Sequence, residues 1–396
     1  MKAAKWFSDV TLGLAFTSCL TLGAQVNTEV PAVEPNAKPV TVEHIKIHGT
    51  ALEGNLEGDT VDRDVIVFLP PSYAKSKSRR YPVVYALHGY SIGAEQWTHE
   101  IHVPQTIEGA FAQGAKEMIV VLPDSKTIHN GSMYSSSATT GDFEKFIAHD
   151  VVSYIDAHYR TIPNRTSRGL VGHSMGGYGA SRIGMKYPNV FGSLYIMSPC
   201  CMSARMAGGG GTRPGARPAG APGTGAAAPG AAAAVAGAAP QGPPTPNGPS
   251  ALELAVAAAK TPEDVAKLPM AFQTQLASAA AWSPDPKNPP LYADLPTKDG
   301  VPQPDVQAKW AANAPLAFVD QYIGNLRQYH GIAMDVGDQD GLRIDAGKLH
   351  DILDSYGLAN SFEIYHGTHT SAVADRFQNH VMKFFDQNLC FQANCR

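Results

Sequence analysis

The feature that most constrains the fold of this 396-residue chain is a glycine-rich turn around Ser174. The turn reads Gly172-His173-Ser174-Met175-Gly176, the pattern G-x-S-x-G, between a short apolar run and a helical pattern. In that setting the pattern predicts a sharp strand-to-helix turn that lifts a serine hydroxyl above a sheet. Glycine is needed on both sides because a side chain there would collide with the tightly turned backbone. The N–H groups at the helix start are expected to face the same point.

Short apolar runs alternate with helical patterns along most of the chain. Continuous apolar runs of this kind are typical of strands that are buried on both faces. The pattern predicts an α/β fold, with a mostly parallel central sheet flanked by helices on both faces. The predicted strands are residues 40–47, 61–69, 81–87, 118–122, 170–171, 191–197, 331–336 and 361–365. The predicted helices include residues 142–159, 252–282, 307–327, 346–356 and a last one ending near residue 388.

The alternation is interrupted by a segment of very biased composition. Between Ala207 and Ser250, 35 of the 44 residues are Gly, Ala or Pro. Such a segment buries too little apolar surface to offset the entropy of ordering it. The composition therefore predicts a disordered insertion over residues 207–250.

A second insertion is expected directly behind the first. Helical patterns return with a start signal at Thr261-Pro262-Glu263-Asp264, and a Pro-rich stretch follows up to residue 304. Because these residues lie between two strands of the sheet, they are placed where loops that carry function are often built. We predict a lid-like insertion over 251–305, within one α/β domain of residues 40–396.

The first residues have the composition of an export signal. Lys2 and Lys5 precede a mostly apolar run that ends at Leu22-Gly23-Ala24, which predicts a signal peptide over residues 1–24. Lipoprotein processing at Cys19 is the alternative. No other segment is long and apolar enough to predict a membrane span. The polar, Pro-rich residues 25–39 are expected to form a flexible spacer, and the chain is expected to be periplasmic or secreted.

Removing the signal would leave four cysteines, Cys200, Cys201, Cys390 and Cys395. An even number in an exported chain predicts disulfides, and Cys390 and Cys395 are close enough in sequence to pair. Cys200 and Cys201 could pair with each other or elsewhere. The formal net charge of −4 gives no basic surplus, which argues against a nucleic-acid partner.

A serine nucleophile needs a base, and the base needs an acid to orient it. His369 is the favoured base because it lies in a glycine-containing loop directly after the last predicted strand, with His366 as the nearest competitor. Asp340 is the favoured acid because it lies further out in the loop after the preceding strand, and Asp338 is the alternative. The order Ser174, Asp340, His369 is that of α/β-hydrolases.

Acyl transfer also needs two N–H donors aimed at the developing oxyanion. The first is expected from Met175, directly after the nucleophile, and the second from Tyr90 in the loop after residues 81–87. Trp97 and Tyr134 fall in segments predicted as loops at the same sheet edge. Either side chain could line a substrate pocket, and packing in the core is an equally good interpretation.

Several motifs together resemble the esterase D family. They are His88-Gly89, Val120-Val121-Leu122-Pro123-Asp124, Gly172-His173-Ser174-Met175-Gly176-Gly177 and Gly367-Thr368-His369. The family groups feruloyl and acetyl esterases, S-formylglutathione hydrolases and mycolyltransferases. The resemblance covers residues 40–205 and 300–388. It implies an α/β-hydrolase fold whose triad falls on Ser174, Asp340 and His369.

These observations predict a serine esterase that acts on small-molecule or glycan-linked esters through an acyl-serine intermediate. An acyltransferase that moves the acyl group to a sugar or other alcohol is the alternative, because the same acyl-enzyme serves both reactions. A non-catalytic carbohydrate-binding or adhesion module is a third possibility, since a fold does not fix a function. We find no sequence motif for a metal or an organic cofactor.

Overall fold

The computed structural model of the protein describes residues 26–203 and 248–392. The predicted signal peptide with Cys19, most of the predicted 207–250 insertion and Cys395 lie outside the described residues. Those expectations therefore stay predictions.

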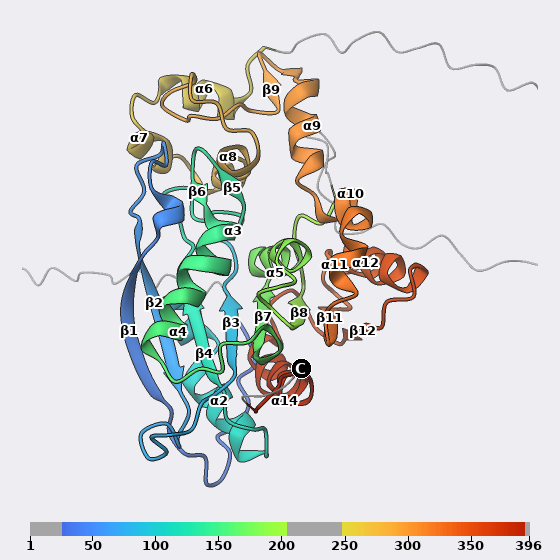
Figure 1. Ribbon diagram of the computed structural model, residues 1–396. Coiled ribbons are helices and arrows are strands. Elements are labelled where there is room, and N and C mark those ends of the chain that lie inside the picture. Colours follow the sequence, from blue (N-terminus) through green and yellow to red (C-terminus); the bar gives the residue numbers. More distant parts are fainter. Residues whose placement is uncertain (1–25, 204–247, 393–396) are drawn as a thin grey trace, which may run out of the picture.

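The core of the molecule is an eight-stranded sheet. Its first three strands pair antiparallel and the remaining pairs are parallel, which confirms the predicted α/β-hydrolase architecture (Figure 1). In spatial order the strands are β1 (Thr41–His48), β2 (Asp62–Leu69), β4 (Ile119–Pro123), β3 (Val83–Leu87), β7 (Arg168–His173), β8 (Ser193–Met197), β11 (Gly331–Gly337) and β12 (Ser361–Tyr365).

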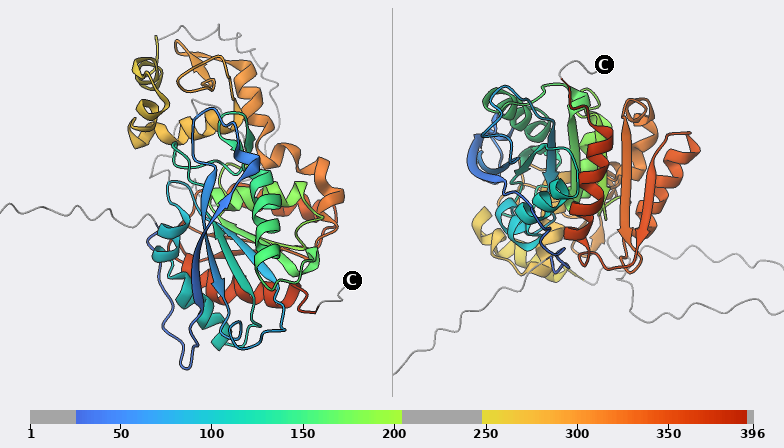
Figure 2. Two further views of the ribbon diagram at one scale, coloured as in Figure 1. Left: turned by 60° about the vertical axis from the view of Figure 1, so that its left-hand side comes forward. Right: turned by 90° about the horizontal axis from the view of Figure 1, so that it is seen from below.

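Helices cover both faces of the sheet, because successive strand residues point to opposite faces (Figure 2). In β3, Val83 and Tyr85 belong to one buried cluster, and Val84 and Ala86 belong to the other. The first cluster packs against α3 (Phe143–Lys145), α4 (Val152–His158), α5 (Met175–Lys186) and α12 (Arg343–Ser355). The second packs against α1 (Ala94–Glu100), α2 (Val103–Ala112), α13 (Val373–Arg376) and α14 (Met382–Asn388).

Helix α1 replaces a segment around Trp97 that is predicted as loop, so that prediction was wrong, and α2 was not predicted. Gly93, before α1, has no side chain that could cap the helix, and the side chain of His102, before α2, makes no capping hydrogen bond. His102 itself adopts a left-handed conformation with a φ of 50°, which breaks what would otherwise be one helix. Two short helices without polar caps leave little trace in the sequence.

The predicted flexible spacer is also wrong for the part that the structure describes. Val26 is 5% exposed and belongs to the buried cluster beneath α1 and α2. The Gln105 side-chain amide donates to the Pro31 carbonyl at 2.7 Å, and the Val40 N–H donates to Glu108 at 2.9 Å. Hydrogen bonds between side chains of α2 and backbone groups thus hold this proline-rich segment in place, and composition does not reveal such bonds.

Residues 250–312 form a cap at the end of the molecule toward which β3 and β4 point (Figure 1). The predicted helix 252–282 is three helices, and Thr261 with Pro262 starts the second, as the start signal indicated. The cap has a small core of its own around Leu252, Val265 and Leu276. Its elements are α6 (Ala251–Ala258), α7 (Pro262–Ala266), α8 (Met270–Trp282), β9 (Thr297–Lys298), β10 (Val301–Pro302) and α9 (Pro304–Ala312).

Helix α8 joins the cap to the body of the protein. Trp282 donates from its indole nitrogen to the Ser135 hydroxyl at 3.2 Å, and the Ser137 hydroxyl bonds the Ala280 carbonyl. Ser135 and Ser137 lie on either side of the start of β5 (Ser136–Ser137), which pairs with β6 (Gly141–Asp142). After the cap, α10 (Pro315–Phe318) and α11 (Ile323–Leu326) return the chain to β11.

A buried ion pair ties the last helices to the sheet. Arg376 of α13 donates to Asp335 of β11 at 2.8 Å, and both residues are almost fully buried. Burial outweighs the attraction of Arg376 and raises the pKa of Asp335 to about 6.

Among the residues that the structure describes, no helix combines the length and apolar composition needed to cross a membrane.

Candidate active site

The turn around Ser174 is built from close backbone contacts. Ser174 joins β7 to α5 with φ 59° and ψ −113°, a conformation that is costly for a residue with a side chain. A Cβ atom on Gly172 would lie 2.1 Å from the carbonyl oxygen of Gly176. One on Gly176 would lie 2.0 Å from the carbonyl oxygen of Leu87. The two glycines are therefore required by the packing of three backbone segments.

Two loops bring a histidine and an aspartate to this turn. His369, after β12, has its Nε2 atom 2.9 Å from the Ser174 Oγ atom. Its Nδ1 atom lies 2.7 Å from an oxygen of Asp340, in the loop after β11. An ionised carboxylate only accepts, so Nδ1 carries the proton and Nε2 is left to accept from the serine hydroxyl. The three predicted residues thus form a continuous hydrogen-bonded chain.

The competing pair, Asp338 and His366, bond each other instead. Their side chains meet at 3.0 Å on the surface, and Asp338 also accepts from the Gly367 N–H. The His366 side chain is 85% exposed, so it points away from Ser174. This separation favours Asp340 over Asp338, and His369 over His366.

The surroundings of Asp340 favour the ionised form of its carboxylate. Burial by itself would raise its pKa, but the hydrogen bond and charge of His369 and the Leu342 N–H together hold the pKa below its ordinary value. The Asp340 side chain is only 4% exposed, while that of His369 is 35% exposed. The triad is therefore open to solvent on the histidine side and closed on the acid side.

A second histidine, His173, holds the backbone of His369 in place, and the sequence pattern does not indicate this role. The His173 Nε2 atom lies 2.8 Å from the His369 carbonyl oxygen and donates to it. The two rings lie 4.8 Å apart between centroids. Burial, reinforced by the nearby charge of His369, lowers the pKa of His173 to about 3, so the ring stays neutral. One sequence gives no signal for this role, because the residue before the serine is a free position in G-x-S-x-G.

The backbone around Tyr90 lies beside the serine, as predicted. A Cβ atom on Gly89 would be 3.6 Å from the Ser174 Cβ atom. At Gly131, a Cβ atom would meet both the Met175 side chain and the Tyr90 ring, within 2.8 Å. Met175 is the first residue of α5, so its N–H has no acceptor within the helix. Both predicted oxyanion donors therefore belong to segments that meet at the nucleophile.

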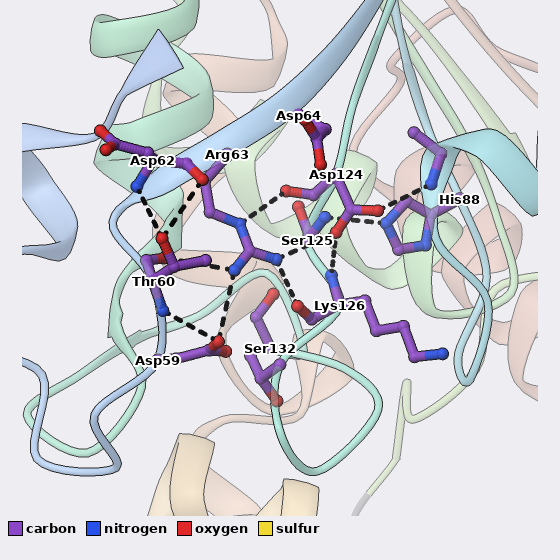
Figure 3. Close-up of polar contacts among 12 residues, drawn as sticks. Asp59, Thr60, Asp62, Arg63, Asp64, His88, Asp124, Ser125, Lys126 and Ser132 are labelled. Carbon is purple, nitrogen blue, oxygen red and sulfur yellow. Dashed lines mark hydrogen bonds and ion pairs between the residues drawn. The ribbon is translucent and has the colours of Figure 1, made fainter. Parts of the chain in front are cut away.

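A buried polar network holds the loop that carries Tyr90 (Figure 3). His88 accepts from the Ser125 N–H at 2.8 Å and donates from Nδ1 to the Gly89 carbonyl at the same distance. Burial lowers the pKa of His88, which keeps the ring neutral, as these two bonds require.

The neighbouring Asp124 extends this network to β2. It accepts from the N–H groups of Ala94 and Lys126, both at 2.9 Å, and from the Arg63 guanidinium at 2.9 Å. Arg63 also reaches the Lys126 carbonyl and lies 3.6 Å from Asp59 (Figure 3). These bonds join His88 and Ala94, on either side of Tyr90, to residues 124–125 and through Arg63 to β2.

Trp97 and Tyr134 do not line a pocket in this structure, so that expectation needs correction. Trp97 is fully buried and packs edge-on against Phe377, within the cluster on the α1–α2 side of the sheet. Tyr134 is also fully buried, and its hydroxyl donates to the His88 carbonyl at 3.2 Å. Tyr134 therefore braces the 88–90 loop from within the core.

Comparison with known proteins identifies the family of this chain. The family model for the putative esterases matches residues 60–389. The chain belongs to this family. The match confirms the resemblance to the esterase D group that the motifs indicated.

Individual relatives of this esterase-family chain match shorter stretches. The endo-1,4-beta-xylanase/feruloyl esterase of Xylanibacter ruminicola is 30% identical over 138 residues, which cover 33% of this chain and 19% of the relative. An esterase of Mycobacterium tuberculosis is 30% identical over 132 residues, covering 33% of this chain and 27% of the relative. The aligned stretches thus span less than a third of these curated relatives.

Solved structures match over most of the chain at low identity. A ferulic acid esterase superposes with a TM-score of 0.56 and 19% identity, covering 89% of this chain and 99% of that chain. A fluorophosphonate-binding serine hydrolase of Staphylococcus aureus gives 0.52 and 14%, covering 90% and 100%. Likeness at these identities establishes the shared fold.

The cysteines after β8 lie beside the active site of this esterase-family protein. Cys200 and Cys201 are both half-buried and are not joined by a disulfide, so the alternative in which they pair with each other does not occur. The Cys200 N–H donates to the Ser174 carbonyl at 3.1 Å. Within residues 26–203 and 248–392, no three His, Cys, Asp or Glu side chains are placed to hold a metal ion.

Proposed function

We propose that this protein hydrolyses carboxylic esters through an acyl-serine intermediate on Ser174. The observation that carries the proposal is the chain of contacts from Ser174 to His369 and on to Asp340, at 2.9 and 2.7 Å. Family membership supports ester chemistry, and the strained turn presents the serine where an ester can reach it.

The reaction follows from the protonation states. His369 takes the hydroxyl proton of Ser174 on Nε2 as Oγ attacks the ester carbonyl carbon. The proton then passes to the alcohol oxygen as the bond from that oxygen to the carbonyl carbon breaks. Water attacks the acyl-serine with the same histidine as base, which releases the acid and restores the serine hydroxyl. Asp340 holds the imidazole in the required tautomer and stabilises its cation.

The oxyanion of each tetrahedral intermediate is assigned to the N–H groups of Met175 and Tyr90. Donors of this kind lower the barrier by about 2.7–4 kcal/mol each when they are preorganised. Preorganisation at Tyr90 is supported by the bonds of His88 and Tyr134 to its loop.

The exposure of the site favours water as the acyl acceptor. The His369 side chain is about one-third exposed, so water can approach the position from which it would attack the acyl-serine. Among the relatives, one carries feruloyl esterase in its description, so hydroxycinnamate esters of sugars are the first substrates to test. Export to the periplasm or beyond is part of the same proposal and rests on the residue pattern of 1–24.

The test is active-site labelling joined to product analysis. A fluorophosphonate probe should label the wild-type protein, and the Ser174→Ala variant should remain unlabelled and lose p-nitrophenyl acetate hydrolysis. Products from a panel of acetyl and feruloyl esters, with and without a sugar acceptor, separate hydrolysis from acyl transfer. A wild-type protein that is folded, unlabelled and inactive on the whole panel would contradict the proposal.

A further inference from the structure

The segment before the first strand passes directly over the loop that carries His369. It is anchored on both sides of this crossing. Upstream, Val26 is buried and its N–H donates to Glu100 at 2.8 Å. Downstream, the Pro31 carbonyl accepts from Gln105 at 2.7 Å. Residues 26–31, which we call the N-terminal strap, are thus fixed to the two helices α1 and α2.

Between these anchors the strap bonds the histidine loop at Ser371. The Glu29 N–H donates to the Ser371 carbonyl at 2.8 Å, and the Thr28 hydroxyl lies 3.2 Å from the same oxygen. Ser371 in turn accepts from the Thr368 N–H on its own hydroxyl, at 2.9 Å. Ser371 is thus bonded both to the strap and to Thr368, the residue directly before His369.

Thr28 also caps the helix that follows the loop. The N–H of Ala374, in the first turn of α13, donates to the Thr28 hydroxyl at 3.1 Å. The helical run that begins with α13 and continues to residue 388 needs such partners at its start, because its first N–H groups have no acceptor within the helix. In this case the cap comes from a residue 346 positions away in the sequence.

Other contacts support the first half of the loop. His173 donates to the His369 carbonyl, and Asp338 accepts from the Gly367 N–H. Both of these contacts lie before Thr370 in the sequence. Without the strap, Val373 and Ala374 would still pack in the cluster with α1 and α2, but the Ser371 carbonyl would lose its hydrogen bonds to Thr28 and Glu29.

We propose that the N-terminal strap positions the general base, with Thr28 as the positioning residue. The inference rests on the proposed role of His369 in ester hydrolysis. Thr28 does not touch the reacting atoms. It holds Ser371 and the start of α13 so that the imidazole stays within hydrogen-bond distance of Ser174.

The test compares Thr28→Val, which keeps the shape and removes the hydroxyl, with Thr28→Ser, which restores a hydroxyl. We expect kcat for p-nitrophenyl acetate to fall about 5- to 30-fold in Thr28→Val, with KM changed less than about twofold. Thr28→Ser should recover most of this loss. Val33→Ala, at an exposed position of the same segment, should leave kcat unchanged.

Two further measurements keep the inference falsifiable. Amide hydrogen exchange at Thr368 and Ala374 should become at least about tenfold faster in Thr28→Val. Glu29→Pro removes the N–H that bonds Ser371 and should lower kcat in the same way. Rates are taken per molecule of folded enzyme, counted by fluorophosphonate labelling, so that partial unfolding is not mistaken for slower chemistry.

The outcomes separate the two proposals. If Thr28→Val and Glu29→Pro lower only the melting temperature, with kcat per labelled molecule unchanged, the strap is merely structural and the inference is overturned. If the wild-type protein is neither labelled nor active, the proposed function fails. In that case, faster exchange at Ala374 would still show that the strap holds the loop.

Discussion

The serine and the histidine of the candidate triad are held in place in different ways. The Ser174 turn is fixed by glycines and close backbone contacts, both between β7 and α5 and with the ends of β3 and β8. The His369 loop is fixed by side chains and N–H groups from distant segments: His173, Asp338, Asp340, Thr28 and Glu29.

This difference affects both how well each part of the site can be predicted from the sequence and how mutations disturb it. The glycines that this turn requires lie within a few residues of the serine, so the turn can be recognised in the sequence and is damaged chiefly by added side chains. A loop held by remote partners is encoded in pieces, so it can be displaced by small changes far from the chemistry. Four experiments test this contrast.

The largest effect is expected where the histidine loop meets its acid. Asp340→Asn should lower kcat about 10³- to 10⁴-fold, because an amide no longer enforces the tautomer that accepts the serine proton. Asp338→Asn should change kcat by less than about threefold, because Asp338 forms an exposed pair with His366. Steady-state kinetics on both variants measure the difference. A larger loss at Asp338 would reverse the assignment of the acid.

The next effect concerns the folding of the serine turn. Gly172→Ala should destabilise the protein by about 3 kcal/mol or more, because the added methyl group would lie 2.1 Å from a backbone oxygen that cannot move freely. Gly347→Ala is the matched control in α12, where a Cβ atom would make only an ordinary contact at 3.9 Å. It should stabilise the helix by about 0.5–1 kcal/mol. Urea unfolding distinguishes the two, and equal stabilities would disprove the steric argument.

The same contrast explains how far the sequence could predict the structure. The strands were predicted to within a few residues because buried parallel strands are continuous apolar runs. Ser174, Asp340 and His369 could be named because each follows such a run. Their catalytic roles remain predictions, and the structure adds the distances between them.

Features that depend on remote partners were missed. Nothing in residues 26–39 shows that the backbone there has hydrogen-bond partners on α1 and α2. His173 occupies a position that the motif leaves free, and its acceptor is a carbonyl 196 residues further along the chain. Trp97 was misplaced because helix α1 begins without a polar cap. Local pattern reading detects none of these relations.

The third experiment uses pH to examine His173. Its pKa is about 3 in the folded protein and about 6.5 when unfolded, so between these values only the unfolded chain binds the proton. Stability from this group is therefore complete above pH 6.5 and falls by about 1.4 kcal/mol per pH unit as the pH drops toward 3.

The His173→Gln variant keeps an N–H donor for the His369 carbonyl but does not titrate. The slope of its unfolding free energy against pH, between pH 4 and 6, should be shallower than that of the wild type by about 1.4 kcal/mol per pH unit. Contributions from other groups cancel in this difference. Parallel curves would mean that His173 is charged in the folded protein.

The smallest effect is expected at the brace of the 88–90 loop. Tyr134→Phe removes the bond to the His88 carbonyl and should cost about 1 kcal/mol of stability, with a two- to fivefold lower kcat. Tyr85→Phe is the control, because within the described part of the chain the Tyr85 hydroxyl is buried without a hydrogen-bond partner. Removing it should not lower kcat or stability. If both variants behave alike, Tyr134 has no specific part in holding the loop.

Strand β1 has a practical consequence for anyone who shortens this protein. It pairs with β2 along eight residues, from Thr41 to His48, yet the family match begins only at residue 60. A chain trimmed to that match would start just before β2 and leave its hydrogen-bonding edge open, beside the buried Val65 and Val67. Open edges of this kind recruit other chains and cause aggregation. The residues that the family match covers are therefore fewer than the residues that the folded domain includes.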